Sequence, residues 1–218
     1  MRLEWSEMMT NVSQTTRTAT IRFSATLDTI DTTTVLRLPH KASRSLPSRG
    51  QVAVQGSISG HEFRTVLEPD GTKGHWMRLD QALRQAAHVS AGDRVNVTVE
   101  VAPDWPEPEV PPDLTAALES APRKIKDIWD DITPMARWEW VRWVNATASP
   151  ATRQRRVEVT ISKMNNGKRR PCCFDLSACT DPALAKNGKL RSTTSSTVGP
   201  AASSSPLGNR VEGRATLE

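Results

Sequence analysis

The stretch QVAVQGSISGHEFRTVLEP, residues 51–69, decides the fold of this chain. Apolar residues or glycine stand at every second position from Val52 to Ile58, as in a strand that buries one face. The Ser59-Gly60 dipeptide favours a tight turn, and the alternation resumes after it. The stretch therefore predicts a β-hairpin with one face in a core.

The same period of two recurs before and after this hairpin. Alternating segments lie at residues 21–27 and 95–101, and shorter strands are expected at 35–38 and 75–79. Asp80 stands where the N-cap of a brief helix carrying Leu83 and Ala87 belongs. Several short strands with one small helix predict a small antiparallel β-barrel.

The period becomes helical after a Pro-rich stretch. APDWPEPEVPP, residues 102–112, combines prolines with acids, so we expect an extended linker. Beyond it, one apolar stripe joins Ile125, Ile128, Trp129 and Ile132. Thr133-Pro134 and Ser149-Pro150 each offer an N-cap followed by Pro at the first helical position.

The last predicted helix has an ambiguous centre. It runs from Pro150 to Asn166 and stops at Gly167, with Val157 and Ile161 on one apolar stripe. The letters VEVTI within it are equally typical of a strand. The Pro and Gly at its ends favour the helix.

These patterns divide the chain into five parts and predict an α+β protein. We expect a disordered leader at 1–17, the barrel at 18–101, the linker at 102–112, a helical unit at 113–179 and a disordered tail at 180–218. The tail is rich in Ser, Thr, Gly, Ala and Pro, and it has too few large apolar residues to order itself.

The chain lacks the patterns of membrane insertion and export. It has no run of about 18 apolar residues, and MRLEWSEMMTNVSQTT at its start lacks the apolar core of a secretory signal. We therefore expect a cytoplasmic protein with no transmembrane segment. In a reducing compartment Cys172, Cys173 and Cys179 stay thiols, and a redox role for them stays open. Their spacing is not that of a zinc site, so we predict no metal.

Charge is unevenly distributed along the chain. The net charge is +5. Residues 102–122 carry five acids and no Lys or Arg, whereas residues 121–170 carry twelve bases and five acids. Such asymmetry indicates either an anionic partner or pairing between the two segments.

The stretch from Ser149 to Cys173 holds our candidate contacts for an anionic partner. They are Arg153, Arg155, Arg156, Lys163, Lys168, Arg169 and Arg170. In a nucleic-acid-binding protein these residues would neutralise phosphates. In a scaffold helix they would form a solvated face, partly paired with acids of the neighbouring segments. We favour the scaffold interpretation and retain the residues as candidates.

Trp138 and Arg142 are candidates for a groove. They lie one turn apart, on the face opposite Trp140 and Trp143. Trp on an apolar stripe is usually part of a core. Trp138 lies off that stripe, and with Arg142 it would form a cation–π pair or line a groove.

Enzymatic activity has the least support. His61 or His75 beside a carboxylate would serve as a general base. The chain contains no phosphate loop, dinucleotide fingerprint, nucleophile elbow or HExxH motif. We therefore assign no catalytic residue and no cofactor.

Two long segments resemble known families. Residues 55–100 resemble a small bacterial and archaeal barrel domain of unknown function. The resemblance lies in the hairpin GSISGHEFRTVLEPDG and in the segment that closes the domain, LRQAAHVSAGDRVNVTVE. Residues 110–173, which begin VPPDLTAALES and end KRRPCC, are similar to the helical C-terminal domain of the bacteriocin-protection family, also called YdeI/OmpD-associated. The resemblance implies a double-split β-barrel followed by a helical unit, and a link to survival of antimicrobial peptides. It carries over no catalytic residues.

The barrel is also similar to the swapped-hairpin fold of AbrB- and MazE-type DNA-binding proteins, through the VSAGDRVNV turn. Three hypotheses follow. The leading one is a non-catalytic binding or stress-protection module that acts through the basic helices and the groove between its two parts, with a partner that stays unknown. The second is a nucleic-acid-binding protein that uses an AbrB-like barrel or the basic helices. The third is a small-molecule enzyme.

Overall fold

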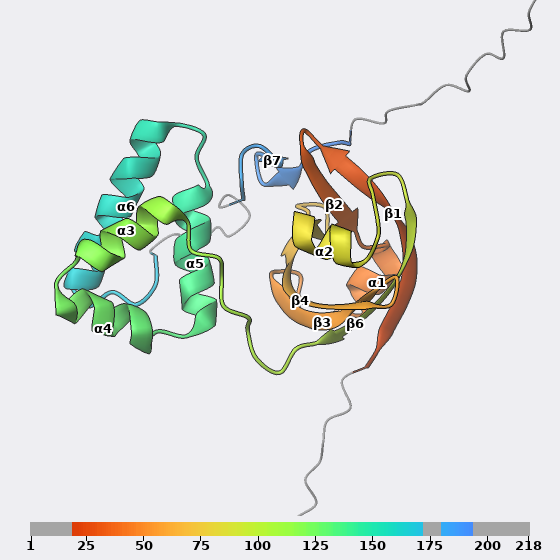
Figure 1. The fold of residues 1–218 in the computed structure, drawn as a ribbon, viewed down its shortest axis with the longest axis horizontal. Helices are drawn as coiled ribbons and strands as arrows, with labels where there is room; N and C mark the ends of the chain where they lie inside the picture. The colour runs from red at the N-terminus through yellow and green to blue at the C-terminus, as the bar shows by residue number, and fades with distance from the viewer. Residues whose placement is uncertain (1–18, 172–179, 194–218) are drawn as a thin grey trace, which may run out of the picture.

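Six antiparallel strands close into a barrel in the order β1-β2-β5-β4-β3-β6 (Figure 1). They are β1 (Ile21–Ile30), β2 (Thr33–Arg37), β3 (Val52–Ile58), β4 (His61–Pro69), β5 (His75–Leu79) and β6 (Arg94–Val101). Two short helices, α1 (His40–Arg44) and α2 (Gln81–Ala86), connect them. The computed structural model describes residues 19–171 and 180–193.

The β3–β4 hairpin is confirmed in place and in type. Ile58 pairs with His61, and the register continues to Val52 opposite Leu67. Ser59 and Gly60 both have positive φ, at 49° and 89°, as a two-residue turn of type I′ requires. The alternation therefore turns Val52 and Leu67 into the barrel core, where both are buried.

Four helices follow the linker, and with the barrel they confirm the α+β class. They are α3 (Pro112–Ser120), α4 (Arg123–Asp131), α5 (Pro134–Asn145) and α6 (Pro150–Asn165), and they share one apolar core around Leu114, Trp140 and Met164. The Oγ1 of Thr133 accepts from the Ala136 N–H, as the predicted N-cap of α5 should.

The segment VEVTI is helical, which settles its two interpretations. The hydroxyl of Ser149 caps α6 by accepting from the Thr152 N–H. At the other end Gly167 has φ +74° and its N–H donates to the Met164 carbonyl at 2.8 Å. Gly tolerates this left-handed conformation, so the chain leaves the helix where the sequence places its end.

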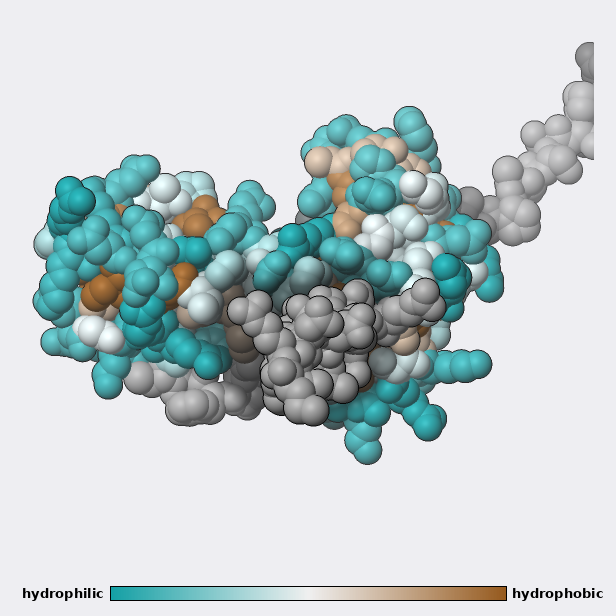
Figure 2. All heavy atoms as spheres, turned by 90° about the horizontal axis from the view of Figure 1, so that it is seen from below, coloured by the Kyte–Doolittle hydropathy of each residue, from teal (hydrophilic) through white to brown (hydrophobic). Residues whose placement is uncertain are grey.

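The two units contact each other through a small apolar cluster. Ala53 and Val66, on the outer face of the barrel, pack with Ala102, Trp105 and Trp138. The linker and α5 thus lie against β3 and β4. Figure 2 shows hydrophilic residues over most of one face of both units, with apolar residues in small separate spots. No helix among the described residues is long and apolar enough to cross a membrane.

Residues 180–193 differ from the expected disordered tail. They form a small hairpin of β7 (Ala185–Lys186) and β8 (Lys189–Leu190) that lies beside the barrel (Figure 1). Leu184 is fully buried against Ile30, Val35 and Trp76. Composition alone did not predict this, because the apolar contact surface belongs to the barrel and not to the segment.

Replacing Leu184 with Ala should release this hairpin from the barrel while the barrel stays folded. The side chain fills a site made of three barrel residues, and losing such packing costs about 2–5 kcal/mol, more than two-residue strands can offset. We expect much faster hydrogen exchange at the Leu190 amide, which donates to the Asp70 carbonyl at 3.0 Å. Lys186→Ala, at an exposed position, is the control. Unchanged exchange in Leu184→Ala would contradict this account of the docking.

Candidate functional site

A pocket of about 370 Å³ lies between the barrel and the helical unit. The barrel contributes Glu68, Trp76 and Arg78, the linker contributes Glu107 and Glu109, and α5 contributes Trp138 and Arg142. Small-molecule sites have volumes of about 300–1,000 Å³ and often lie between domains. Size and position thus both suit a ligand.

A buried ion pair crosses from one unit to the other beside this pocket. The Nη2 of Arg142 donates to Oε2 of Glu68, and the two side chains expose 7% and 13% of their area. Gln51 donates to the other carboxylate oxygen at 2.8 Å. Burial raises the pKa of Glu68, and the charge of Arg142 opposes that rise. The pair fixes α5 against β4.

Arg142 has more hydrogen-bonding capacity than these contacts use. Its Nη1 is buried and has no partner within residues 19–171 and 180–193. A buried donor without an acceptor costs about 1–3 kcal/mol. Because a buried ion pair contributes little net stability compared with apolar residues, we interpret Arg142 as a residue that sets geometry.

Trp138 lines the pocket with its ring and not with its N–H. The indole Nε1 donates to the Pro106 carbonyl at 2.7 Å. Trp76 is held in the same way, with its Nε1 donating to the Pro69 carbonyl at 3.3 Å. Both aromatic side chains therefore have their polar atom satisfied by the backbone.

The pocket lining has more acids than bases. The acids are Glu68, Asp80, Glu107, Glu109 and Asp181, and the bases are Arg78 and Arg142. Arg78 pairs with Asp181 at 2.9 Å, and Glu107 pairs with Arg137 at 2.9 Å. Asp80 and Glu109 are exposed, and neither has an ion-pair partner in the described part of the chain.

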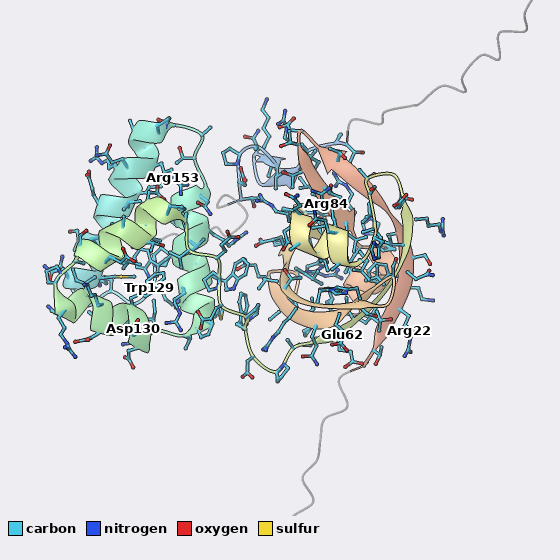
Figure 3. The ribbon with its side chains drawn as sticks, viewed as in Figure 1. Arg22, Glu62, Arg84, Trp129, Asp130 and Arg153 are labelled. Carbon is cyan, nitrogen blue, oxygen red and sulfur yellow. The ribbon has the colours of Figure 1, made fainter. Side chains whose placement is uncertain are left out.

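The basic residues proposed from the sequence lie away from this pocket, on α6 and the turn after it. Arg153, labelled on the helical unit in Figure 3, bonds both oxygens of Asp113 on α3, at 2.6 and 2.9 Å. These bonds lower the pKa of Asp113. Arg156 and Lys163 both stack over the Trp143 ring, 5.4 Å from its centroid. These three cations therefore hold the helices together.

The arginines in the turn after α6 also form ion pairs within the helical unit. Arg169 pairs with Asp131 at 2.7 Å, and Arg170 bonds both carboxylate oxygens of the buried Glu139. Arg155 and Lys168 are exposed and make no ion pair within the described residues. Five of the seven candidates thus have an internal partner.

The two groove candidates do come together at the pocket. Trp138 and Arg142 both line it, but Arg142 pairs with Glu68. Sequence reasoning missed Glu68, because an acid on the outer face of a strand is normally solvated. The available signal was that Ala53 and Val66 put apolar side chains on the same outer face.

The two histidines proposed as bases lie elsewhere. His61 is exposed beside the hairpin turn, and His75 is buried in the barrel. Nε2 of His75 lies 3.0 Å from the Gly50 carbonyl. Neither lines the interdomain pocket or the second pocket, around Phe63 and Thr98.

His75 should make the fold sensitive to acid. Burial lowers the pKa of His75 below 6.5, with Arg49 assisting and Asp70 opposing. The unfolded chain then binds more protons than the folded chain below about pH 6.5. The free energy of unfolding therefore decreases as the pH decreases, by at most about 1.4 kcal/mol per pH unit. Urea denaturation at pH 7.5 and 5.5 measures the slope. His75→Gln removes the titrating ring, and an unchanged slope there would place the acid sensitivity in another group.

The described residues contain no candidate metal site. No group of three or more His, Cys, Asp or Glu among them is placed to hold an ion. Cys172, Cys173 and Cys179 lie outside the residues that the structure describes.

Comparison with known proteins gives two adjacent family matches. Residues 18–99 match the model of a domain of unknown function (DUF1905). Residues 107–167 match a family described as bacteriocin-protection, YdeI or OmpD-associated. Both matches confirm the resemblance seen in the sequence. No curated protein matches the chain.

Proposed function

Because this chain joins an N-terminal domain of unknown function to a domain of the bacteriocin-protection, YdeI or OmpD-associated family, we propose that it is a non-catalytic binding protein of antimicrobial protection. Its ligand occupies the pocket between the two domains. The single observation that carries this proposal is that both domains build the pocket and a buried ion pair locks them around it.

The ion pair supports a binding role better than a purely structural one. Glu68 and Arg142 lie 74 residues apart in the chain and come from different domains. Replacing such a pair by apolar residues is often neutral or stabilising, so stability alone is a weak reason to keep it. Its directional bonds instead hold Trp138 and the linker at a fixed distance from the barrel, which is what a preformed site needs.

The chemistry of the lining supports binding over catalysis. No His, Cys or Lys is among the described residues that line the pocket. The buried carboxylate of Glu68 is already held by Arg142 and Gln51, so it is poorly placed to act as a base.

Most of the positive charge on which the nucleic-acid hypothesis depends has an internal partner. Arg153, Arg169 and Arg170 each pair with an acid of the helical unit, and two further cations pack on Trp143. A cation that must leave an internal partner to contact phosphate contributes less to binding. We therefore place the site at the pocket and not on α6.

A tolerance assay tests the proposal. A bacterial host expressing the chain should survive a panel of bacteriocins and antimicrobial peptides better than the host alone. Glu109→Lys places a long cation at the pocket rim without touching a core residue, and it should remove the protection. Trp138→Ala should do the same by deleting one pocket wall.

Two controls make the assay decisive. Arg155→Ala changes an exposed cation outside the pocket and should leave protection intact. Equal soluble expression and equal melting temperatures for Glu109→Lys and the parent chain exclude a folding defect. Full protection by folded Glu109→Lys and Trp138→Ala proteins would overturn the pocket as the site.

A further inference from the structure

We propose that the interdomain pocket binds a basic peptide segment, with an Arg or Lys side chain beside Asp80 and Glu109 and a backbone carbonyl toward Arg142. This inference rests on the proposed function, since it names the ligand class of the same pocket. Three properties of the pocket carry it: the charge left over in its lining, the orientation of its tryptophans and the incomplete bonding of Arg142.

Internal pairing leaves the pocket with negative charge. Its two bases are neutralised, Arg142 by Glu68 and Arg78 by Asp181. Asp80 and Glu109 remain as exposed carboxylates without a cation in the described part of the chain. Asp80 uses Oδ1 to cap α2, accepting from the Leu83 N–H at 2.7 Å, so its other oxygen is available. The exposed polar groups of the lining are thus mainly hydrogen-bond acceptors. A ligand with a cationic donor complements them.

The tryptophan geometry suits the apolar stem of such a side chain. The N–H of Trp138 is used by the Pro106 carbonyl, so the indole presents its ring to the pocket and offers no donor. Pro108 and Val141 add apolar surface beside it. Lys and Arg bury their methylene stems along such surfaces, and their charged ends are attracted to a tryptophan face.

The unused nitrogen of Arg142 distinguishes a peptide from a simple amine. Arg142 lines the pocket, is more than nine-tenths buried, and has no acceptor at Nη1 in the part of the molecule described. A peptide carbonyl at the pocket wall would supply the acceptor that this nitrogen lacks, with the bond from Nη2 to Glu68 kept. A peptide brings both a cation and backbone carbonyls, whereas a free alkyl amine brings only the cation.

Capped pentapeptides titrated into the full chain test this inference. The probes are Ala-Ala-Arg-Ala-Ala, the same peptide with Gln or Glu at the centre, and agmatine as a free guanidinium. Chemical shifts of the Trp138 indole N–H report occupancy of the pocket. We expect the Arg peptide to bind at least about tenfold more tightly than the Gln and Glu peptides, as one or two charged hydrogen bonds imply, and more tightly than agmatine.

A charge-matched pair of variants locates the contact. Asp80→Asn with Glu109→Gln removes both carboxylates while Asn keeps the helix cap, and it should weaken the Arg peptide about tenfold. Asp104→Asn with Glu119→Gln makes the same charge change at exposed acids outside the pocket, and it should leave the affinity unchanged.

The outcomes separate this inference from the proposed function. Gln or Glu peptides that shift Trp138 as strongly as the Arg peptide would overturn the charge preference and leave the pocket as a ligand site. Agmatine binding as tightly as the Arg peptide would overturn the peptide assignment. No shift with any probe would overturn the inference, while loss of tolerance in Glu109→Lys would still support the proposed function.

Discussion

Replacing Arg142 with Ala is expected to cost about 3–5 kcal/mol of the free energy of unfolding and to separate the two domains. The change leaves the Glu68 carboxylate buried with Gln51 as its remaining partner, and an uncompensated buried charge carries that cost. The domains can escape it by moving apart to admit water. Urea denaturation measures the loss, and small-angle scattering measures the increase in radius.

The pH dependence and a paired variant check the cause. Burial raises the pKa of Glu68 above 4.5, and losing Arg142 raises it further. Protonated Glu68 tolerates burial, so stability is retained at low pH and lost as pH rises through the folded-state pKa. We therefore expect a smaller loss at pH 5 than at pH 8. Glu68→Met with Arg142→Met should recover most of the stability, and an Arg142→Ala protein within 0.5 kcal/mol of the parent, on the order of an ordinary surface change, would refute a buried pair.

The parts of the fold that the sequence predicted are those set by neighbours along the chain. Ser59-Gly60 needs only its own backbone to make the hairpin turn, and both residues have the positive φ that the turn requires. Thr133 and Ser149 bond amides three residues away, so their caps could be read directly. The starts of α5 and α6 were predictable for that reason.

The candidate site depends on contacts that no local pattern encodes. Arg142 could be recognised as lying off the apolar stripe, but its partner Glu68 is 74 residues away. Arg153 likewise finds Asp113 40 residues away. A basic stretch shows its charge in the sequence, whereas the acids that neutralise it become visible once the helices are packed. This is why the sequence overstated the free charge of α6.

The same reasoning explains the hairpin after residue 180. Its main apolar contact is Leu184, which is buried in a site on the barrel, and the ion pairs Arg78–Asp181 and Arg191–Asp31 add to it. Gly71 and Gly188 also approach closely there, since a Cβ on Gly71 would lie 2.2 Å from the Gly188 carbonyl oxygen. A prediction from composition considers only the residues of the segment itself. It therefore leaves out the apolar surface that the barrel supplies.

Replacing Gly56 with Ala should strongly destabilise the barrel, although it adds only one methyl group. A Cβ at this position would lie 1.8 Å from the Thr98 carbonyl oxygen and 2.9 Å from Val99 Cα. Both are backbone atoms of β6, so no side chain can rotate to make room. Gly56 pairs directly with Val99 in the register of β3 and β6, and the two strands would have to part at the centre of their ladder.

The expected loss is at least about 3 kcal/mol, the upper end of the cost of overpacking, because ladder hydrogen bonds break as well. Gly50→Ala is the matched control. Its Cβ would meet Ser48 Oγ at 3.4 Å, an ordinary contact, so we expect a change within about 0.5 kcal/mol. Denaturant midpoints of the two variants give the comparison. A Gly56→Ala protein as stable as Gly50→Ala would mean that β3 and β6 do not approach as closely as the closed barrel requires, and the placement of Val66 and Glu68 toward the pocket would then lose its structural basis.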